Sequence, residues 1–335
     1  MAQKEPYYNY AWHIESTDNT LNSKGYTIDK DADINVTEAW KISMGSGVKV
    51  AVIDDGADVD HEDLKSNLFV AYNADDDSSN INANSEEASH GNSCAGFIVA
   101  PINEKGSVGI APESKLIAIR QNDDSDANTI KAFEYAKDQG AKVISCSWGT
   151  NNVSDLVVAE LKSLYDANIT VLFASGNDGK SLDVAGTNDE SEVEWIIGVG
   201  ASTEANDVGS YSNYGQNIEV IAPGGDTEQS SGLLGIDDTG EHGGTNQLNL
   251  VTNNYSFIDG TSFATPITAG VVALMYATYP NITPAQVKDI LINTTTKVGT
   301  DVDASYDANG FDSKRAYGKI NAGLAVSEAK KLADN

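Results

Sequence analysis

The segment Phe257-Ile-Asp-Gly-Thr-Ser-Phe-Ala-Thr-Pro266 is the most informative part of this chain of 335 residues. Within it, Ser262 follows Gly260 and Thr261 and opens an apolar stretch that predicts a long buried helix. A serine at a helix N-terminus lies where backbone N–H groups and the helix dipole favour developing negative charge, as attack on a carbonyl requires. An ordinary N-cap serine has the same signature, so a nucleophilic role depends on partners elsewhere in the chain.

Two candidate partners precede this serine. The run Lys49-Val-Ala-Val-Ile-Asp54 is apolar and rich in β-branched residues, which predicts a buried parallel strand that carries Asp54 at its carboxyl end. Further on, His90 precedes a second apolar segment and stands at the start of a predicted helix. The order Asp54, His90, Ser262, with gaps of 36 (54 to 90) and 172 (90 to 262) residues, is one in which catalytic Asp-His-Ser triads occur.

The periodicity of the chain predicts alternating strands and helices. Strands that alternate with helices of this length indicate βαβ units, a parallel sheet and an α/β fold, with active residues at the carboxyl ends of the strands. The region 224–251, rich in Gly, Thr and Asn, predicts a long surface loop or insertion. Strands are predicted at 48–53, 116–120, 142–146, 170–174, 195–200 and 218–222, and helices at 90–100, 127–139, 155–167, 262–278, 284–293 and 321–333.

Five short motifs follow one another along the chain, and together they resemble the subtilase family of serine endopeptidases, with the kexin/furin branch looking most similar. The resemblance covers roughly residues 5 to 330. It implies a three-layer subtilisin-like α/β fold with a mostly parallel sheet flanked by helices. It also implies one catalytic domain over 1–335, with 1–40 packing on it as an N-terminal extension. The motifs are Asp54-Asp55-Gly56, His90-Gly91 with Cys94-Ala95-Gly96, Ser145-Cys-Ser147-Trp148-Gly149, Ala174-Ser175-Gly176-Asn177, and Gly260-Thr261-Ser262.

The resemblance assigns the chemistry to four residues. Ser262 attacks a peptide carbonyl while His90 takes its proton, and Asp54 orients His90. Asn177 and the backbone N–H of Ser262 stabilise the oxyanion. Taken from the residues alone, Asn177 fits an ordinary turn and His90 a structural core position. A subtilase-fold binding protein without catalysis is the rival function, although such proteins commonly lack a triad member; an acidic cation-binding surface protein fits the motifs poorly.

The resemblance also implies a cleft in which substrate binds as an added strand. In kexin and furin, acids select paired basic residues. Asp55 and Glu87 match two acids that contact the P2 side chain of the substrate in this branch. Asn152 stands where the branch has an acid for the P1 side chain, and Lys131 stands where furin has an acid for the P4 side chain. We expect a preference for basic P2 and, less strictly, basic P1; cleavage after large apolar residues is the alternative. Asp183, Asp189, Glu190 and Glu192 are the other candidate sources of a P1 acid. The residues expected to bind substrate are Asp55, Glu87, Ser147, Trp148, Gly149, Asn152, Ala174, Ser175 and Gly176.

A calcium site is a further implication of the resemblance. Two carboxylates, an Asn oxygen and loop carbonyls form an oxygen shell suited to Ca²⁺, although a pair of solvated Asp residues near a turn has the same sequence. The acidic stretch 301–310 is a weaker candidate, because it fits no EF-hand register. The expected ligands are Asp33, Asp63, Pro101, Asn103, Lys105 and Ser107.

Composition bounds the partners. A formal charge of −29 argues against nucleic acids and anionic membranes as binding partners, because both would be repelled. The charge suits basic substrates, bound cations or a saline medium, although a solvated acidic surface explains most of it. The two cysteines, Cys94 and Cys146, are too few for a disulfide framework, and buried free thiols are the default expectation.

The ends of the chain and its apolar content carry little information on location. No apolar signal region follows Met1, and no run of 18 apolar residues predicts a membrane span. Family analogy therefore supplies a secreted or extracytoplasmic location, with no prodomain or P domain seen in this sequence. It also supplies the partners: protein or peptide substrates, and a prodomain, inhibitor or chaperone.

Overall fold

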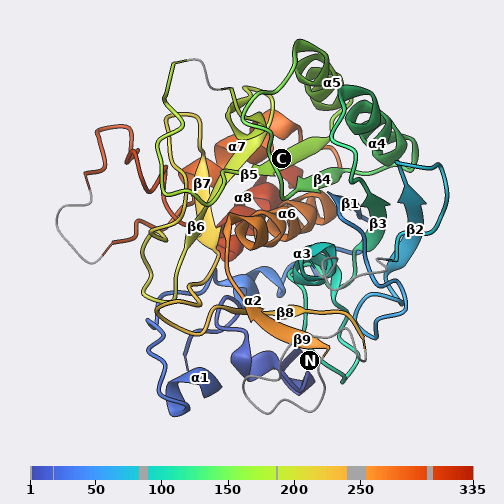
Figure 1. Ribbon diagram of the computed structural model, residues 1–335. Helices are drawn as coiled ribbons and strands as arrows, with labels where there is room; N and C mark the ends of the chain where they lie inside the picture. The colour runs from blue at the N-terminus through green and yellow to red at the C-terminus, as the bar shows by residue number, and fades with distance from the viewer. Residues whose placement is uncertain are drawn as a thin grey trace.

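The computed structural model describes residues 2–17, 19–82, 90–185, 188–239, 254–299 and 305–334. Its centre is a sheet of seven parallel strands in the order β2-β3-β1-β4-β5-β6-β7 (Figure 1). The predicted α/β class is therefore confirmed. The strands are β1 (Lys49–Asp54), β2 (Leu68–Asn73), β3 (Lys115–Arg120), β4 (Val143–Cys146), β5 (Thr170–Ala174), β6 (Ile197–Ser202) and β7 (Val220–Pro223).

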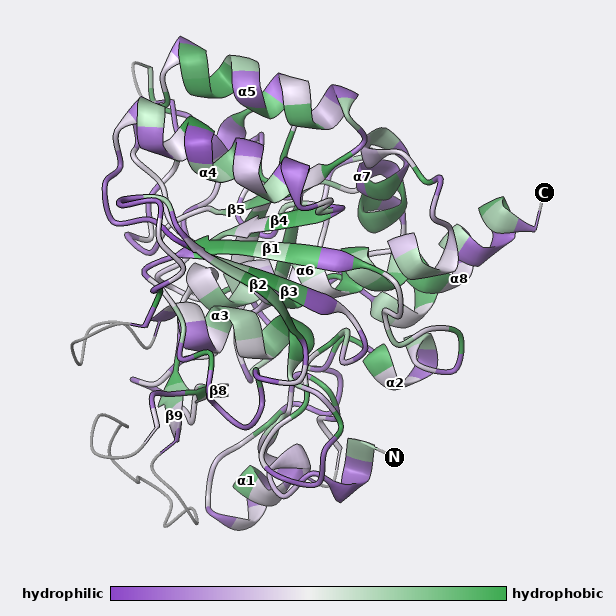
Figure 2. Cartoon of the chain, turned by 90° about the vertical axis from the view of Figure 1, so that its right-hand side faces the viewer, coloured by the Kyte–Doolittle hydropathy of each residue, from purple (hydrophilic) through white to green (hydrophobic). Residues whose placement is uncertain are grey.

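Helices cover both faces of the sheet (Figure 2). Along β1, Ala51 and Ile53 pack into the core under α4 (Asp126–Asp138) and α5 (Asp155–Asp166), whereas Val50 and Val52 pack into the opposite core. That second core holds α3 (His90–Val99), α6 (Thr261–Thr278), α7 (Pro284–Asn293) and α8 (Ala322–Ala333). A central strand buried on both faces must be apolar throughout, which is why β1 shows no alternation.

Helix α6 is the central helix of the larger core. By length and composition it passes the test for a membrane span, but 83% of its most apolar window is buried inside the protein. Its residues from Phe263 to Tyr276 are all buried. The apolar sequence of α6 is thus explained by packing against α3, α8 and the sheet.

The predicted boundaries of the twelve elements agree with the structure to within two residues, but three strands were missed. Strand β2 lies at the sheet edge and is mostly half-buried, so its sequence lacks a clear period. Within the predicted surface loop 224–251, β8 (Leu233–Ile236) is fully buried and pairs antiparallel with β9 (Tyr255–Ile258). The loop prediction is therefore wrong for Leu233–Ile236, since this short apolar run packs on α3, where Ile236 faces Gly96. Residues 240–253 lie outside the described residues.

The N-terminal segment packs on the sheet domain through buried contacts. It contains two short 3₁₀ turns, α1 (Thr20–Ser23) and α2 (Val36–Ala39). Trp12 is fully buried and donates its indole N–H to the carbonyl of Gly232 at 2.9 Å. The carbonyl of Ile34 accepts from the N–H of Ala322 at the start of α8.

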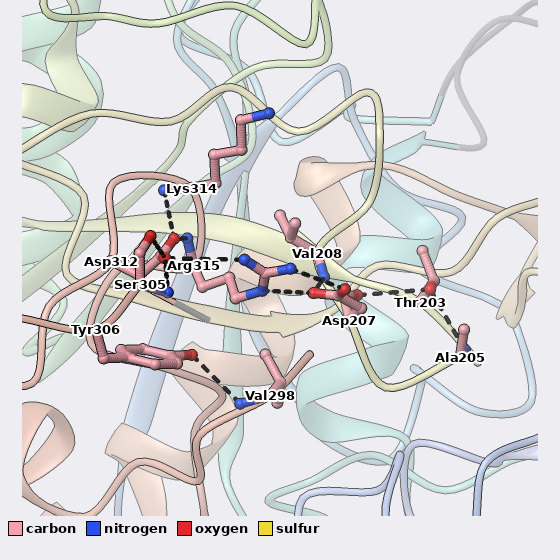
Figure 3. A network of polar contacts seen from close by, with 10 residues as sticks. All are labelled: Thr203, Ala205, Asp207, Val208, Val298, Ser305, Tyr306, Asp312, Lys314 and Arg315. Carbon is pink, nitrogen blue, oxygen red and sulfur yellow. Dashed lines mark hydrogen bonds and ion pairs between the residues drawn. The ribbon is translucent and has the colours of Figure 1, made fainter. Parts of the chain in front are cut away.

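A polar network ties the region after α7 to the loop that follows β6 (Figure 3). Arg315 donates to both oxygens of Asp207, at 2.7 and 3.0 Å, in a bidentate ion pair. Asp312 caps the same region by accepting from the N–H and hydroxyl of Ser305. The carboxylate of Asp207 is therefore neutralised within the protein.

Candidate active site

The structure gathers the predicted catalytic residues at the carboxyl edge of the sheet. Asp54 ends β1, and Asn177 follows β5 by three residues. His90 begins α3, and Ser262 lies in the first turn of α6. The carboxyl ends of parallel strands and the N-termini of the following helices meet at one edge of such a sheet, so four residues far apart in sequence converge there.

His90 and Asp54 form a close polar pair. Nδ1 of His90 lies 2.7 Å from Oδ1 of Asp54, whose side chain is almost fully buried. Burial by itself disfavours both charged forms, but each group stabilises the charge of its partner. The pKa of His90 is consequently raised well above its usual range by Asp54, and the pKa of Asp54 is lowered by His90. The Nδ1 contact leaves Nε2 as the nitrogen that can exchange a proton with substrate groups.

Ser262 is positioned by contacts around its own backbone. Its carbonyl accepts from the hydroxyl of Ser147 at 2.6 Å, and its hydroxyl lies 3.3 Å from the carbonyl of Ser147. The buried thiol of Cys94 is 3.9 Å from Nδ1 of His90 and 3.5 Å from the carbonyl of Ser262. These contacts bring the histidine and the serine to the same small region. Cys94 is a free, buried thiol as expected, and so is Cys146.

The side chain of Asn177 is oriented by its neighbour in the Gly-Thr-Ser motif. Its Oδ1 accepts from both the N–H and the hydroxyl of Thr261, each at 2.9 Å. With the carbonyl oxygen of the amide occupied in this way, the Nδ2 group faces the opposite side and is available as a donor. Asn177 and Ser262 line the same cavity, so a carbonyl bound there can receive two hydrogen bonds.

Two adjoining cavities lead to these residues. The first, of about 170 Å³, holds six of the predicted residues, namely Ser147, Trp148, Gly149, Ala174, Ser175 and Gly176, beside Asn177 and Ser262. The second, of about 310 Å³, holds Asp54, Asp55, His90 and Asp124 and shares Ser147, Trp148 and Gly149 with the first. Seven of the nine residues expected to bind substrate therefore lie along one continuous cleft.

The remaining two predicted substrate residues are placed differently. Asn152 is exposed and absent from the lining of both cavities, whereas its neighbour Asn151 lines the smaller one. The structure therefore places Asn151, whose backbone is left-handed, at the cleft in place of the predicted Asn152. Glu87 lies outside the described residues. Lys131, the predicted P4 position, pairs with Asp77 at 3.1 Å.

An acid nevertheless lines the smaller cavity. Asp189 is 5% exposed and sits against Gly149, where any Cβ would crowd its carboxylate. One oxygen accepts from the N–H of Asn151 at 3.2 Å, and the other from the N–H and hydroxyl of Ser191. No Lys or Arg pairs with Asp189 within the described ranges. This buried carboxylate is thus held rigidly with its charge uncompensated.

Asp55 borders the larger cavity beside the catalytic pair. Its Oδ1 accepts from the N–H of Gly91 at 2.9 Å. Burial, together with the neighbouring negative charge of Asp54, raises the pKa of Asp55 to about 7. Its charge therefore changes near neutral pH, where a cationic side chain would favour the ionised form.

The predicted calcium residues gather only in part. Asp63 is fully buried and contacts Asn103 at 3.0 Å and the N–H of Ser107 at 2.8 Å. The loop that carries Pro101, Asn103, Lys105 and Ser107 folds back on it. Asp33 is elsewhere: its carboxylate accepts from Ser16 and from the N–H of Asn35. These hydrogen bonds with Ser16 and Asn35 occupy both carboxylate oxygens of Asp33, so the structure does not bring this residue to the cluster.

Glu5 takes the place that sequence analysis assigned to Asp33. Its two oxygens accept from the N–H groups of Glu104 and Lys105, and its side chain is 3% exposed. Glu5 and Asp63 are therefore two buried carboxylates beside one loop, and no cationic side chain pairs with either among the described residues. A Cβ on Gly106 would overlap the carboxylate of Asp63 and the hydroxyl of Tyr255, so the loop closes over the acid only because residue 106 is glycine. The carboxylate oxygens of Glu5 and Asp63 are ligands of the kind that a hard cation such as Ca²⁺ prefers.

Family comparison decides the identity of the fold. The model of the subtilase family matches residues 45–318. The chain belongs to the subtilase family. It is 33% identical to subtilisin of Bacillus pumilus, over 84% of this chain and 89% of that protein. It is 32% identical to a calcium-dependent protease of Nostoc sp., over 96% of this chain but 51% of that protein, so it spans about half the length of this relative. These relatives are bacterial subtilases, and nothing among them points to the kexin/furin branch.

Solved structures with the same fold extend over the whole chain. A protease of Pseudoalteromonas arctica superposes with a TM-score of 0.78 at 24% identity, covering 97% of this subtilase and 99% of that chain. The serine protease of Aeromonas sobria, solved in complex with a chaperone, has a TM-score of 0.81 at 21% identity and covers 98% of this subtilase and 67% of that chain. At these identities the likeness establishes the fold, a mostly parallel sheet flanked by helices.

One residue that matters in this site was not found by sequence analysis, and another was not singled out from its neighbours. Glu5 lies about 60 positions before Asp63, in a segment with no motif of its own, and only the docking of the N-terminus reveals it. Asp189 was one of four acids considered for the P1 position, and nothing used at that point distinguished it from Asp183, Glu190 and Glu192. Its Asp-x-x-Glu spacing is the sequence signal of a capping box, and this box forms at the 3₁₀ helix η3 (Glu190–Glu192).

Proposed function

We propose that this chain is the catalytic unit of a serine endopeptidase that acts through an acyl-enzyme. The 2.7 Å contact between His90 and Asp54, beside a serine at a helix N-terminus, is the observation that supports this function most directly. A catalytically silent binding protein of the same fold is the second candidate. It is disfavoured because it gives no reason to keep a buried charged pair next to an oriented asparagine.

The residues of the site have complementary roles in the proposed reaction. A change of rotamer breaks the hydrogen bond from the Ser262 hydroxyl to the Ser147 carbonyl. The hydroxyl then passes its proton to Nε2 of His90 while its oxygen attacks the peptide carbonyl. Asn177 Nδ2 and the Ser262 N–H receive the oxyanion. Histidine then protonates the leaving amine, the ester remains on Ser262, and water deacylates it with His90 as base. Asp54 holds the histidine tautomer and stabilises its cation throughout.

We infer that the cleft prefers basic side chains at P1 and P2. Asp189 in the smaller cavity supports the P1 preference, and Asp55 in the larger cavity supports the P2 preference. Neither acid pairs with a Lys or Arg among the described residues, so a Lys or Arg of the substrate would supply that partner. Broad cleavage after large apolar residues is the outcome expected if water screens both acids.

Calcium is the cofactor that we propose, with a structural role. Glu5, Asp63 and Asn103 would hold the ion, together with carbonyls of the loop from Pro101 to Ser107. The bound ion would offset the repulsion between two buried carboxylates, and it takes no part in the chemical steps. The Nostoc relative is a calcium-dependent protease, which supports this role. A secreted or extracytoplasmic location, and a prodomain or chaperone as folding partner, belong to the same proposal.

Labelling with a fluorophosphonate probe tests the proposed activity. The wild-type chain should be labelled covalently and should cleave peptides, and Ser262→Ala should lose both properties while it keeps its thermal transition. A Ser163→Ala variant serves as control, since it removes a hydroxyl on α5, outside both cavities of the cleft, and retains the nucleophile and its label. Labelling of the Ser262→Ala chain, or no labelling of the wild type, would reject the proposed nucleophile.

A further inference from the structure

A third cavity adjoins the catalytic residues on the side away from the proposed P1 pocket. It has a volume of about 230 Å³ and includes Asn177 and Gly260 in its lining. The third cavity shares Asn177 with the smaller cavity that contains Asp189. The smaller cavity in turn shares Ser147, Trp148 and Gly149 with the larger cavity that contains Asp55. The three cavities therefore form a series, in which Asn177 separates the third from the other two.

This order places the third cavity on the leaving-group side of the scissile bond. In the proposed reaction, the substrate carbonyl that Ser262 attacks lies beside Asn177. The substrate residues that precede this carbonyl occupy the two cavities that share Gly149. A peptide is a linear chain, so the residues after the scissile bond leave in the opposite direction, past Asn177 and Gly260. The third cavity lies in that direction.

Its walls are acidic. Asp226, Glu228 and Asp259 line this cavity, and none of them forms an ion pair with a Lys or Arg among the described residues. The contrast with nearby Asp207 is informative, because Arg315 neutralises that carboxylate (Figure 3). The protein thus compensates one acid of this region internally and leaves the acids that face the cavity uncompensated.

The acids are held in place by hydrogen bonds. Asp259 accepts from the N–H and hydroxyl of Thr227, at 2.6 and 2.8 Å. Asp226 is 8% exposed, and its Oδ1 accepts from the N–H groups of Glu228 and Gln229. Two of the three carboxylates are therefore preorganised, which reduces the entropy lost when a cationic side chain binds.

A larger cavity continues the acidic surface. It has a volume of about 610 Å³ and shares Ser210 and Asp226 with the third cavity. Glu204 is part of its lining and is 1% exposed, and its Oε2 has no hydrogen-bond partner among the described residues. Burial, and in addition the charge of Asp226, raises the pKa of Glu204. Ser231 and Gly232 donate to Oε1 of Glu204, so one carboxylate oxygen remains unsatisfied at the far end of the groove, where a cationic or hydrogen-bonding group of a ligand would complete it.

We propose that this acidic groove is a leaving-group subsite that selects Lys or Arg at the first two residues after the scissile bond, P1′ and P2′. The inference rests on the proposed endopeptidase function and adds Asp226, Glu228 and Asp259 as specificity residues. The surface acids favour association with a basic leaving segment, and the effect weakens as salt screens it.

Matched internally quenched peptides test the subsite. They share one sequence before the scissile bond and carry Lys-Lys, Lys-Gln, Gln-Lys or Gln-Gln at P1′-P2′. At low ionic strength we expect kcat/KM for Lys-Lys to exceed that for Gln-Gln about tenfold, equivalent to about 1.4 kcal/mol. The ratio should fall in 0.5 M salt and should decrease in Glu228→Gln and in Asp259→Asn. Glu134→Gln, which removes an exposed acid on α4, is the matched control and should keep the wild-type ratio.

The outcomes separate the inference from the function on which it rests. Equal rates for all four peptides in a chain that reacts with fluorophosphonate would overturn the subsite and leave the endopeptidase intact. A preference that survives in both variants, each checked for a normal thermal transition, would overturn its assignment to these acids. Absence of both labelling and cleavage would remove the proposed function, and the inference with it.

Discussion

Replacement of Asp189 by Asn probes the P1 pocket with little change of shape. Asn is a good helix N-cap, so the contacts with Ser191 and the start of the 3₁₀ helix η3 should remain. What changes is the charge that a P1 Arg would meet in the pocket. The assay compares kcat/KM for two substrates that differ only at P1, Arg against Leu, in wild type and variant.

The burial of Asp189 sets the size of the effect. At 5% exposure the carboxylate is little screened by water, so a hydrogen bond from a guanidinium contributes about 1.5–3 kcal/mol. The Arg-to-Leu ratio should therefore fall about 10- to 150-fold in Asp189→Asn. Glu192→Gln is the matched control, because it removes one charge from the same capping box and does not line the cavity.

Two results would refute this reasoning. An unchanged ratio in Asp189→Asn would mean that the P1 side chain does not reach the acid, and the cleft would then discriminate by apolar fit. An equal fall in Glu192→Gln would show that general negative potential is responsible rather than a direct contact.

Three other perturbations have defined outcomes. Chelation should lower the melting temperature by several degrees, because an ion bound at 100 times its Kd stabilises the native state by about 2.7 kcal/mol, and Asp63→Asn should abolish the response to added Ca²⁺ in calorimetry. The preference for Lys over Gln at P2, measured from pH 6 to 8.5, should be present above pH 7 and lost below it, since Asp55 is ionised only above its pKa of about 7; a flat profile would contradict the assignment. Burial lowers the pKa of His13 to about 3, and both of its ring nitrogens lack a hydrogen-bond partner among the described residues. The contribution of neutral His13 to the free energy of unfolding should therefore be complete above pH 6.5. It should be lost as the pH falls from 6.5 to 3, by at most about 1.4 kcal/mol per pH unit. His13→Leu should flatten that slope in denaturant titrations, and parallel curves would argue against His13.

The sequence by itself determined the elements that have a strong local pattern. Strand β1 and helix α6 are continuous apolar runs because each is buried on all sides, and such runs are visible without a structure. The triad was predicted because each member follows a recognisable local signal: Asp54 at a strand end, and His90 and Ser262 at helix starts. Asn177 was found through its motif and not through any periodicity.

Only the tertiary structure decided which distant groups meet. Glu5 reaches the loop beside Asp63 because the N-terminal segment docks on the loop after α3, whereas Asp33 accepts hydrogen bonds from Ser16. Asp189 and Asp259 acquire roles from the cavities that they line. Cavities arise where several loops pack together, and their positions depend on contacts between residues far apart in sequence. Local propensity and spacing do not encode such contacts, so the strands and the triad could be predicted whereas the walls of the cleft could not.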